Sequence, residues 1–196
     1  MNHFHIFTGE PEPVLNSVNE KPEKMKKTAI IFLLITVAFA ACSADKTDLT
    51  LKTGSDGTSE YIPLLEGKRV AVVANQTSMV SNTHLVDTLL SSGTNIRVIF
   101  APEHGFRDLA DAGANITSGT DPVTGIEVIS LYGARKKPAP EDLADIDIVV
   151  FDIQDVGTRF YTYLTTMCYV MEACAENGKS FIVLDRPNPN GYYVDG

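Results

Sequence analysis

The chain has 196 residues, of which 44% are hydrophobic and 21% charged, a composition suited to an ordinary globular protein with one principal domain. Its formal net charge of −9 argues against a nucleic-acid partner, because there is no basic stripe to neutralise phosphates. Tryptophan is absent, so any stacking on a sugar ring must use Tyr or Phe.

The N-terminal part of the chain has the pattern of a targeting sequence followed by a tether. Met25-Lys26-Lys27 precedes an apolar run over 28–41, which is the plan of a secretory signal and is short for a transmembrane helix. The run ends at Cys42 in a sequence that resembles a bacterial lipobox, although an ordinary cleaved signal is the alternative. We expect residues 1–24 to be an over-extended start, 25–42 a lipoprotein signal lipidated at Cys42, and 43–63 a polar tether. This predicts a protein anchored to a membrane of the bacterial cell envelope, facing the periplasm or the cell surface.

From Gly67 onward, apolar runs typical of strands alternate with helical patterns. The expected strands are 68–74, 96–100, 126–131, 146–153 and 180–184, and the expected helices are 84–91, a short one from 140, and 159–176. Such alternation predicts an α/β fold, a Rossmann-like three-layer domain over 64–196 with a mostly parallel sheet. The exit of the first strand, 75–78, lacks the glycine-rich dinucleotide motif, so we expect no nicotinamide cofactor. No other cofactor is expected.

The helix predicted over 159–176 carries apolar residues at helical spacing. They are Tyr161, Leu164, Met167, Cys168, Met171 and Cys174. Cys168 and Cys174 are six residues apart, so they lie on different helix faces and cannot easily form a disulfide. We interpret both as core thiols, and no cysteine spacing suggests a zinc site.

Polar side chains gather after three of the predicted strands, at the edge where open α/β sheets bind ligands. The first cluster is Glu103, His104 and Arg107, the second Asp152, Gln154, Asp155 and Arg159, and the third Asp185, Arg186 and Asn188. A structural alternative exists for each. Asp152 or Asp155 would cap the next helix and hold Arg159. Glu103 would pair with Arg107, and His104 would be a turn residue.

Carboxylates beside arginines suit general acid/base work on a polar substrate. Our preferred acid is Glu103, with Asp152 or Asp155 as its partner. A metal-dependent hydrolase is an alternative, with Glu103, His104, Asp152 and Asp185 as ligands. The arginines would repel a cation, so this alternative ranks lower, and we expect no metal.

Three ordered motifs resemble the exo-β-N-acetylmuramidases of the NamZ/YbbC type. They are Pro102-Glu103-His104-Gly105-Phe106-Arg107, the run from Asp152 to Tyr163, and Asp185-Arg186-Pro187-Asn188-Pro189. The resemblance covers about 67–196 and implies a Rossmann-like N-terminal domain, a smaller C-terminal domain that this chain lacks, and an active site between them. It also implies release of terminal N-acetylmuramic acid from the non-reducing ends of peptidoglycan fragments. Asp108 stands where the family usually has Gly.

The residues agree with such a substrate. The lactyl carboxylate of muramic acid fits a bidentate contact with Arg107, Arg159 or Arg186. His104, Gln154, Tyr163, Asp185 and Asn188 are further candidates for binding muramic-acid saccharides. Glycoside hydrolysis normally uses two carboxyl groups, whose separation decides the stereochemical outcome. The expected role is cell-wall turnover or recycling. A non-catalytic lipoprotein that binds peptidoglycan is the second alternative.

Overall fold

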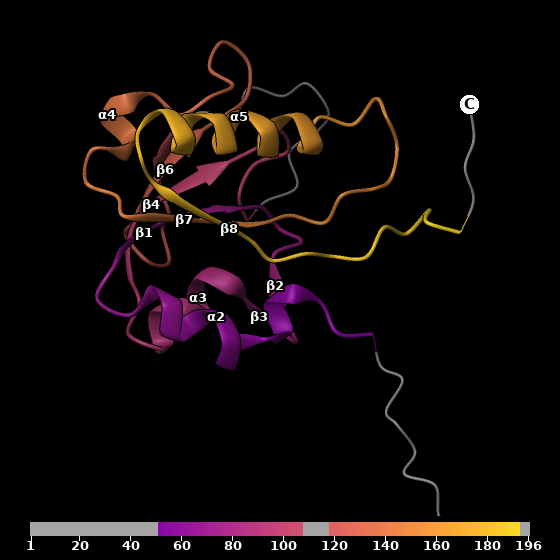
Figure 1. Cartoon of the computed structure of the whole chain (residues 1–196), viewed down its shortest axis with the longest axis horizontal. Helices are drawn as coiled ribbons and strands as arrows, with labels where there is room; N and C mark the ends of the chain where they lie inside the picture. Colours follow the sequence, from indigo (N-terminus) through magenta and orange to yellow (C-terminus); the bar gives the residue numbers. More distant parts are fainter. Residues whose placement is uncertain (1–50, 108–117, 193–196) are drawn as a thin grey trace, which may run out of the picture. The chain divides into compact units, whose positions relative to one another are not determined.

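The computed structural model describes residues 51–107 and 118–192 (Figure 1). The predicted extension, the signal segment and Cys42 lie outside these residues, as do Asp108 and much of the polar loop that follows it. Within the described ranges, no helix has both the length and the apolar character needed to cross a membrane.

A six-stranded sheet forms the centre of the described part, in the order β5-β6-β4-β1-β7-β8. Five strands run parallel, and β5 pairs antiparallel with β6 at one edge. Their bounds are β1 Arg69–Ala74, β4 Asn95–Ala101, β5 Gly119–Thr120, β6 Glu127–Ser130, β7 Ile148–Asp152 and β8 Ser180–Val183. Strand β7 is buried along its whole length and β1 along all but its first residue, which explains their continuous apolar sequences.

Helices cover both faces of this sheet (Figure 1). Helices α2 (Thr58–Leu65) and α3 (Leu85–Ser91) pack on one face, and α4 (Pro140–Leu143) and α5 (Tyr163–Glu176) pack on the other. A two-stranded hairpin, β2 (Met79–Val80) and β3 (Thr83–His84), precedes α3. The predicted three-layer α/β fold is therefore confirmed. When the parallel strands are counted in chain order, β6-β4-β1-β7-β8 is the order 3-2-1-4-5 of a doubly wound sheet. Proteins with such sheets bind ligands at the carboxyl ends of the strands.

Residues 54–63 are folded, so the predicted tether over 43–63 is wrong from Gly54 onward. A short 3₁₀ helix, η1 (Gly54–Asp56), leads directly into α2, where Tyr61 and Leu65 are only 5% and 1% exposed. The Tyr61 hydroxyl donates to the Ser55 carbonyl at 3.0 Å. The Ser, Thr and Asp residues of this segment form turns and helix ends, for which they are suited. A flexible linker has the same amino-acid composition, so composition alone did not distinguish the two.

Helix α5 begins at Tyr163 instead of the predicted Arg159, and only part of its predicted apolar set is buried. Gly157 adopts a left-handed φ of 70°, and turns occupy the residues before the helix. Leu164 and Met171, two of the apolar residues at helical spacing, are 60% and 47% exposed, while Thr166 is buried. The Thr166 hydroxyl can be buried because it donates to the Thr162 carbonyl at 3.1 Å.

The two cysteines of α5 also differ from each other. Cys174 is buried against the sheet, as predicted for a core thiol, and burial raises its pKa to about 11. Cys168 is exposed, so the prediction that it is a core thiol is wrong.

Candidate active site at the carboxyl end of the sheet

Asp152, the last residue of β7, forms a buried ion pair with Arg186. Arg186 Nε donates to Oδ1 of Asp152 at 2.5 Å and Nη2 donates to Oδ2 at 2.9 Å, with side chains that are 7% and 0% exposed. Nη2 also donates to Ser55 Oγ and the Met79 carbonyl. Burial raises the pKa of Asp152, and the guanidinium of Arg186 opposes that rise.

This geometry gives Asp152 no surface for a substrate. It therefore contradicts the prediction that Asp152 is a catalytic carboxylate, and also the alternative in which Asp152 holds Arg159. Arg186 was predicted to bind substrate, but its guanidinium is occupied by Asp152 and by two further acceptors. We assign the pair a structural role, locking the ends of β7 and β8 to the segment before α2.

Arg107 is also committed to protein carboxylates. Its Nη1 and Nη2 donate to Asp87 at 2.9 and 2.6 Å, and its Nε donates to Asp121 at 3.1 Å. The hydrogen bonds from Arg107 lower the pKa of Asp87. Burial acts to raise the pKa of Asp121, yet hydrogen bonds from Thr124 and Arg107 hold it below its ordinary value. The structure therefore contradicts both a Glu103–Arg107 pair and an Arg107 that is free to bind substrate.

Glu103, in contrast, opens into a cavity of about 280 Å³ beside the first turns of α5. The cavity lining includes Tyr132, Lys136, Thr162, Thr165 and Tyr169. Thr162 Oγ1 donates to Glu103 Oε2 at 2.9 Å. A hydrogen bond with Glu103 raises the pKa of Tyr132. Glu103 thus combines two hydroxyl partners with an open cavity, an environment in which a carboxyl group can reach a ligand.

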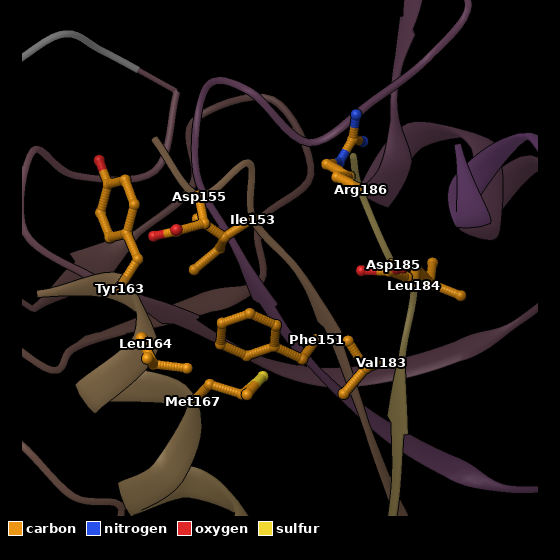
Figure 2. A pocket seen from close by; sticks show the side chains of 10 residues that line it. All are labelled: Phe151, Ile153, Asp155, Tyr163, Leu164, Met167, Val183, Leu184, Asp185 and Arg186. Carbon is orange, nitrogen blue, oxygen red and sulfur yellow. The ribbon is translucent and has the colours of Figure 1, made fainter. Parts of the chain in front are cut away.

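A second cavity, of about 180 Å³, lies on the other side of the start of α5 (Figure 2). Asp155 and Tyr163 lie on one side of it, and Asp185 and Arg186 on the other (Figure 2). Its floor is apolar, formed by Phe151, Leu164, Met167 and Val183. Asp155 accepts a hydrogen bond from the Gly157 backbone N–H at 2.9 Å. It neither holds Arg159 nor caps α5, so the structural alternative for Asp155 is not realised either.

Tyr163 is buried and lines the second cavity together with Asp155. Burial and the neighbouring Tyr161 raise the pKa of its hydroxyl, and the charges of Glu103 and Asp155 contribute in the same direction. The two candidate carboxyl groups therefore act on one buried tyrosine, although each opens into a different cavity.

The other predicted binding residues divide into loop supports and exposed groups. Gln154 Nε2 donates to the carbonyls of Asp155 and Pro187, at 2.8 and 2.9 Å, and so joins the loops after β7 and β8. Asn188 Oδ1 accepts from the Asn190 N–H at 2.9 Å, a local contact. Asp185 is exposed at the second cavity, where its carbonyl accepts from the Gly54 N–H at 2.6 Å.

His104 is half-buried in the loop after β4, and Arg159 is exposed in the loop between β7 and α5. His104 has a left-handed φ of 72°, which is unusual for a residue with a side chain, and its ring stacks on Tyr161 with centroids 6.4 Å apart. Arg159 is exposed and belongs to the lining of neither cavity.

The set proposed for a metal ion does not assemble. In the described ranges, no three side chains of His, Cys, Asp or Glu gather in a way that could hold a cation. Asp152 is enclosed by Arg186, so the ligands expected of a metal-dependent hydrolase are not brought together.

Sequence reasoning missed several residues at this edge of the sheet. Tyr132 and Lys136 follow β6 in a basic, proline-rich stretch that none of the three predicted clusters includes. Thr162 lies inside the motif from Asp152 to Tyr163, of which only Asp152, Gln154, Asp155, Arg159 and Tyr163 were predicted as site residues. No strong sequence signal marked Ser55, because its contact with Arg186 spans most of the domain.

Fold and site together define the class: a Rossmann-like α/β domain with carboxylate-lined cavities at the carboxyl ends of its strands. Residues 70–196 match the sequence profile described as "Exo-beta-N-acetylmuramidase NamZ, N-terminal". The chain belongs to this family.

Known relatives agree with this assignment. The chain is 44% identical over 180 residues to the peptidoglycan β-N-acetylmuramidase NamZ of Bacillus subtilis (strain 168), a match that covers 85% of this chain and 44% of the relative. Two solved DUF1343 family proteins from Bacteroides fragilis NCTC 9343 are 46% identical, each with a TM-score of 0.63. These matches cover 74% and 70% of this chain and 37% and 35% of the two structures. The chain thus spans less than half the length of the relatives it matches.

Proposed function

We propose that this chain provides the N-terminal part of an exo-β-N-acetylmuramidase, which releases terminal N-acetylmuramic acid from the non-reducing ends of peptidoglycan fragments. Family membership supports the reaction class. The observation that carries the site is the position of Glu103, whose carboxylate lines the larger cavity beside the start of α5 and bonds to hydroxyl groups instead of an arginine.

Glycosidases normally place two carboxyl groups around the scissile bond. We assign the general acid to Glu103, because its carboxyl group lines the larger cavity and is held by no arginine among the described residues. Asp155 is the preferred second carboxyl group, since it lines a cavity and makes no salt bridge among the described residues. Tyr163 lines the same cavity as Asp155 and is a further candidate for holding the substrate there.

The cellular setting belongs to the same proposal. A lipid anchor at Cys42 would hold the domain at a membrane of the bacterial cell envelope, in contact with peptidoglycan fragments from cell-wall turnover. The sequence pattern over 25–42 supports this location.

The test is hydrolysis of a chromogenic β-N-acetylmuramide. The chain should be compared with a version extended to the length of the Bacillus subtilis relative, each with and without Glu103→Gln. Turnover by the extended version that Glu103→Gln removes supports the glycosidase and its acid. Turnover that survives the substitution shows that Glu103 is not the acid. If neither version cleaves the muramide but both bind it, the non-catalytic peptidoglycan-binding alternative replaces the proposal.

A further inference from the structure

The cavity that contains Glu103 also contains a cation without a protein partner. Lys136 is the single positively charged residue among those that line it. The side chain is exposed, and no hydrogen bond or salt bridge joins it to any residue in the ranges that the structure covers. Its neighbour Lys137 behaves differently, because Nζ of Lys137 pairs with Glu172 and Glu176 at 3.0 and 2.7 Å. Of the two adjacent lysines, Lys137 is bound by protein carboxylates and Lys136 faces the cavity.

The arginines expected to recognise an anionic substrate are not available for it. Arg107 is shared by two aspartates and Arg186 is buried against Asp152. Arg159 is exposed but lines neither cavity. At the larger cavity, Lys136 is thus the remaining group of the right charge. A cation in this lining can attract the negative charge of an acidic ligand.

The rest of the lining suits one sugar. The volume of about 280 Å³ lies just below the ~300–1,000 Å³ typical of small-molecule sites, so it accommodates a monosaccharide better than an oligosaccharide. Tyr169 offers an aromatic ring at the rim, and Thr162 and Thr165 offer hydroxyl groups. This combination of ring, hydroxyls and one cation matches a hexosamine that carries an acidic substituent.

We propose that this cavity is the subsite for the terminal muramyl residue and that Lys136 binds its lactyl carboxylate. The inference rests on the proposed function and adds the residue that distinguishes a muramyl sugar from an N-acetylglucosaminyl sugar, which lacks the lactyl group. Lys136 is a specificity residue in this scheme: it acts on the charge of the substrate and takes no part in bond cleavage.

The experiment compares Lys136→Met with Lys137→Met in the version extended to the length of the relatives. Direct titration measures the affinity for N-acetylmuramic acid and for N-acetylglucosamine, so the result does not depend on turnover. Lys136→Met should weaken the binding of N-acetylmuramic acid by roughly ten-fold or more, the effect expected for a lost hydrogen bond between charged groups. Binding of N-acetylglucosamine should change less than two-fold, and Lys136→Arg should retain most of the affinity. The matched control, Lys137→Met, should leave both affinities unchanged.

The same variants separate this inference from the proposed function. If the wild type cleaves a chromogenic β-N-acetylmuramide, Lys136→Met should raise KM and leave kcat within about two-fold, as expected for lost uniform binding. Equal weakening of both sugars, or unchanged affinity for N-acetylmuramic acid, would overturn the role of Lys136 whether or not the protein is an enzyme. If the protein cleaves no muramide but binds N-acetylmuramic acid more tightly than N-acetylglucosamine through Lys136, the proposed glycosidase activity is wrong and the proposed subsite stands.

Discussion

Asp152 and Glu103 are both acidic residues at or just after the end of a parallel strand, in motifs that look equally suited to chemistry, but their surroundings are opposite. Asp152 has no exposed side-chain surface and gives both oxygens to one guanidinium. Glu103 faces a cavity and accepts from a threonine hydroxyl. The difference shows that a strand-end carboxylate is assigned a role by its partner and its burial, since a carboxylate enclosed by an arginine stabilises the fold and cannot reach a substrate.

The largest expected effect comes from breaking the buried pair. Arg186→Met leaves Asp152 as an unpaired charge in the interior, which should lower the free energy of unfolding by about 3–5 kcal/mol. Urea denaturation of the purified chain measures this change. Arg159→Met is the control, because Arg159 is exposed and its loss should cost less than about 0.5 kcal/mol. A cost below about 1 kcal/mol for Arg186→Met would remove the structural role assigned to the pair.

At Glu103 we expect a large loss of activity with little loss of stability. Glu103→Gln should reduce turnover of a β-N-acetylmuramide by about 10²–10⁴-fold in the extended version, as for loss of a general acid. Because glutamine has the same shape and can still accept from Thr162, the free energy of unfolding should change by less than about 1 kcal/mol. Steady-state kinetics and urea denaturation of the same sample give both numbers. If the substitution destabilises the protein as strongly as Arg186→Met, the contrast between the two carboxylates is wrong.

Arg107 tests an intermediate case, an arginine shared by two carboxylates at partial burial. Arg107→Met should cost about 2 kcal/mol near pH 7 through its charged hydrogen bonds. The pKa values of Asp87 and Asp121 are lowered below the ordinary 3.8 in the folded state. Their contribution is therefore complete above that pH and is lost as the pH falls through the folded values.

Denaturation at several pH values follows this dependence. The stability difference between the wild type and Arg107→Met should be constant from about pH 7 to pH 5 and should shrink below about pH 4. A difference that stays the same at pH 3 would show that Arg107 acts through packing on Phe106, over whose ring its guanidinium lies at 5.0 Å.

The smallest effect is expected on the outer surface of α5. Lys137→Met removes two salt bridges to Glu172 and Glu176, but both glutamates are more than half exposed, so the cost should be below about 1 kcal/mol. Thermal unfolding at low and high salt is the measurement. A larger loss of stability, or one that high salt does not reduce, would mean that the burial of an ion pair does not predict its contribution to the stability of this domain.

The fold was predictable because its signals are local. Apolar runs over 70–74 and 148–151, inside the predicted strands 68–74 and 146–153, marked buried parallel strands, and the spacing of these strands required crossover helices. The orientation of α5 was not predictable in the same way. Its buried face uses Thr166 and Ala173 beside Cys174, while Leu164 and Met171 are 60% and 47% exposed, so hydrophobic periodicity identified only part of that face. A backbone-bonded threonine can be buried at little cost, and a hydropathy pattern does not record that bond.

The motifs pointed to one edge of the sheet, and four of the predicted residues, Glu103, Asp155, Tyr163 and Asp185, line cavities there. That these cavities form the active site stays a prediction. Which arginine meets which carboxylate depends on contacts between distant segments, such as Arg107 with Asp87 or Arg186 with Asp152. Lys136 was missed because a basic turn without periodicity gives no sign of the cavity beside it.

The contact between Ser55 and Arg186 has a consequence for how the protein is made. The two residues are 131 positions apart in the sequence, and the Gly54 N–H meets the Asp185 carbonyl in the same place. During synthesis, the segment before α2 leaves the ribosome long before its partner exists, so this joint can close only after the last strand of the described sheet has been translated. A recombinant version begun at residue 70, where the family match starts, would remove one side of the joint and leave the Arg186 guanidinium short of an acceptor. Domain boundaries for expression should therefore begin before Thr53.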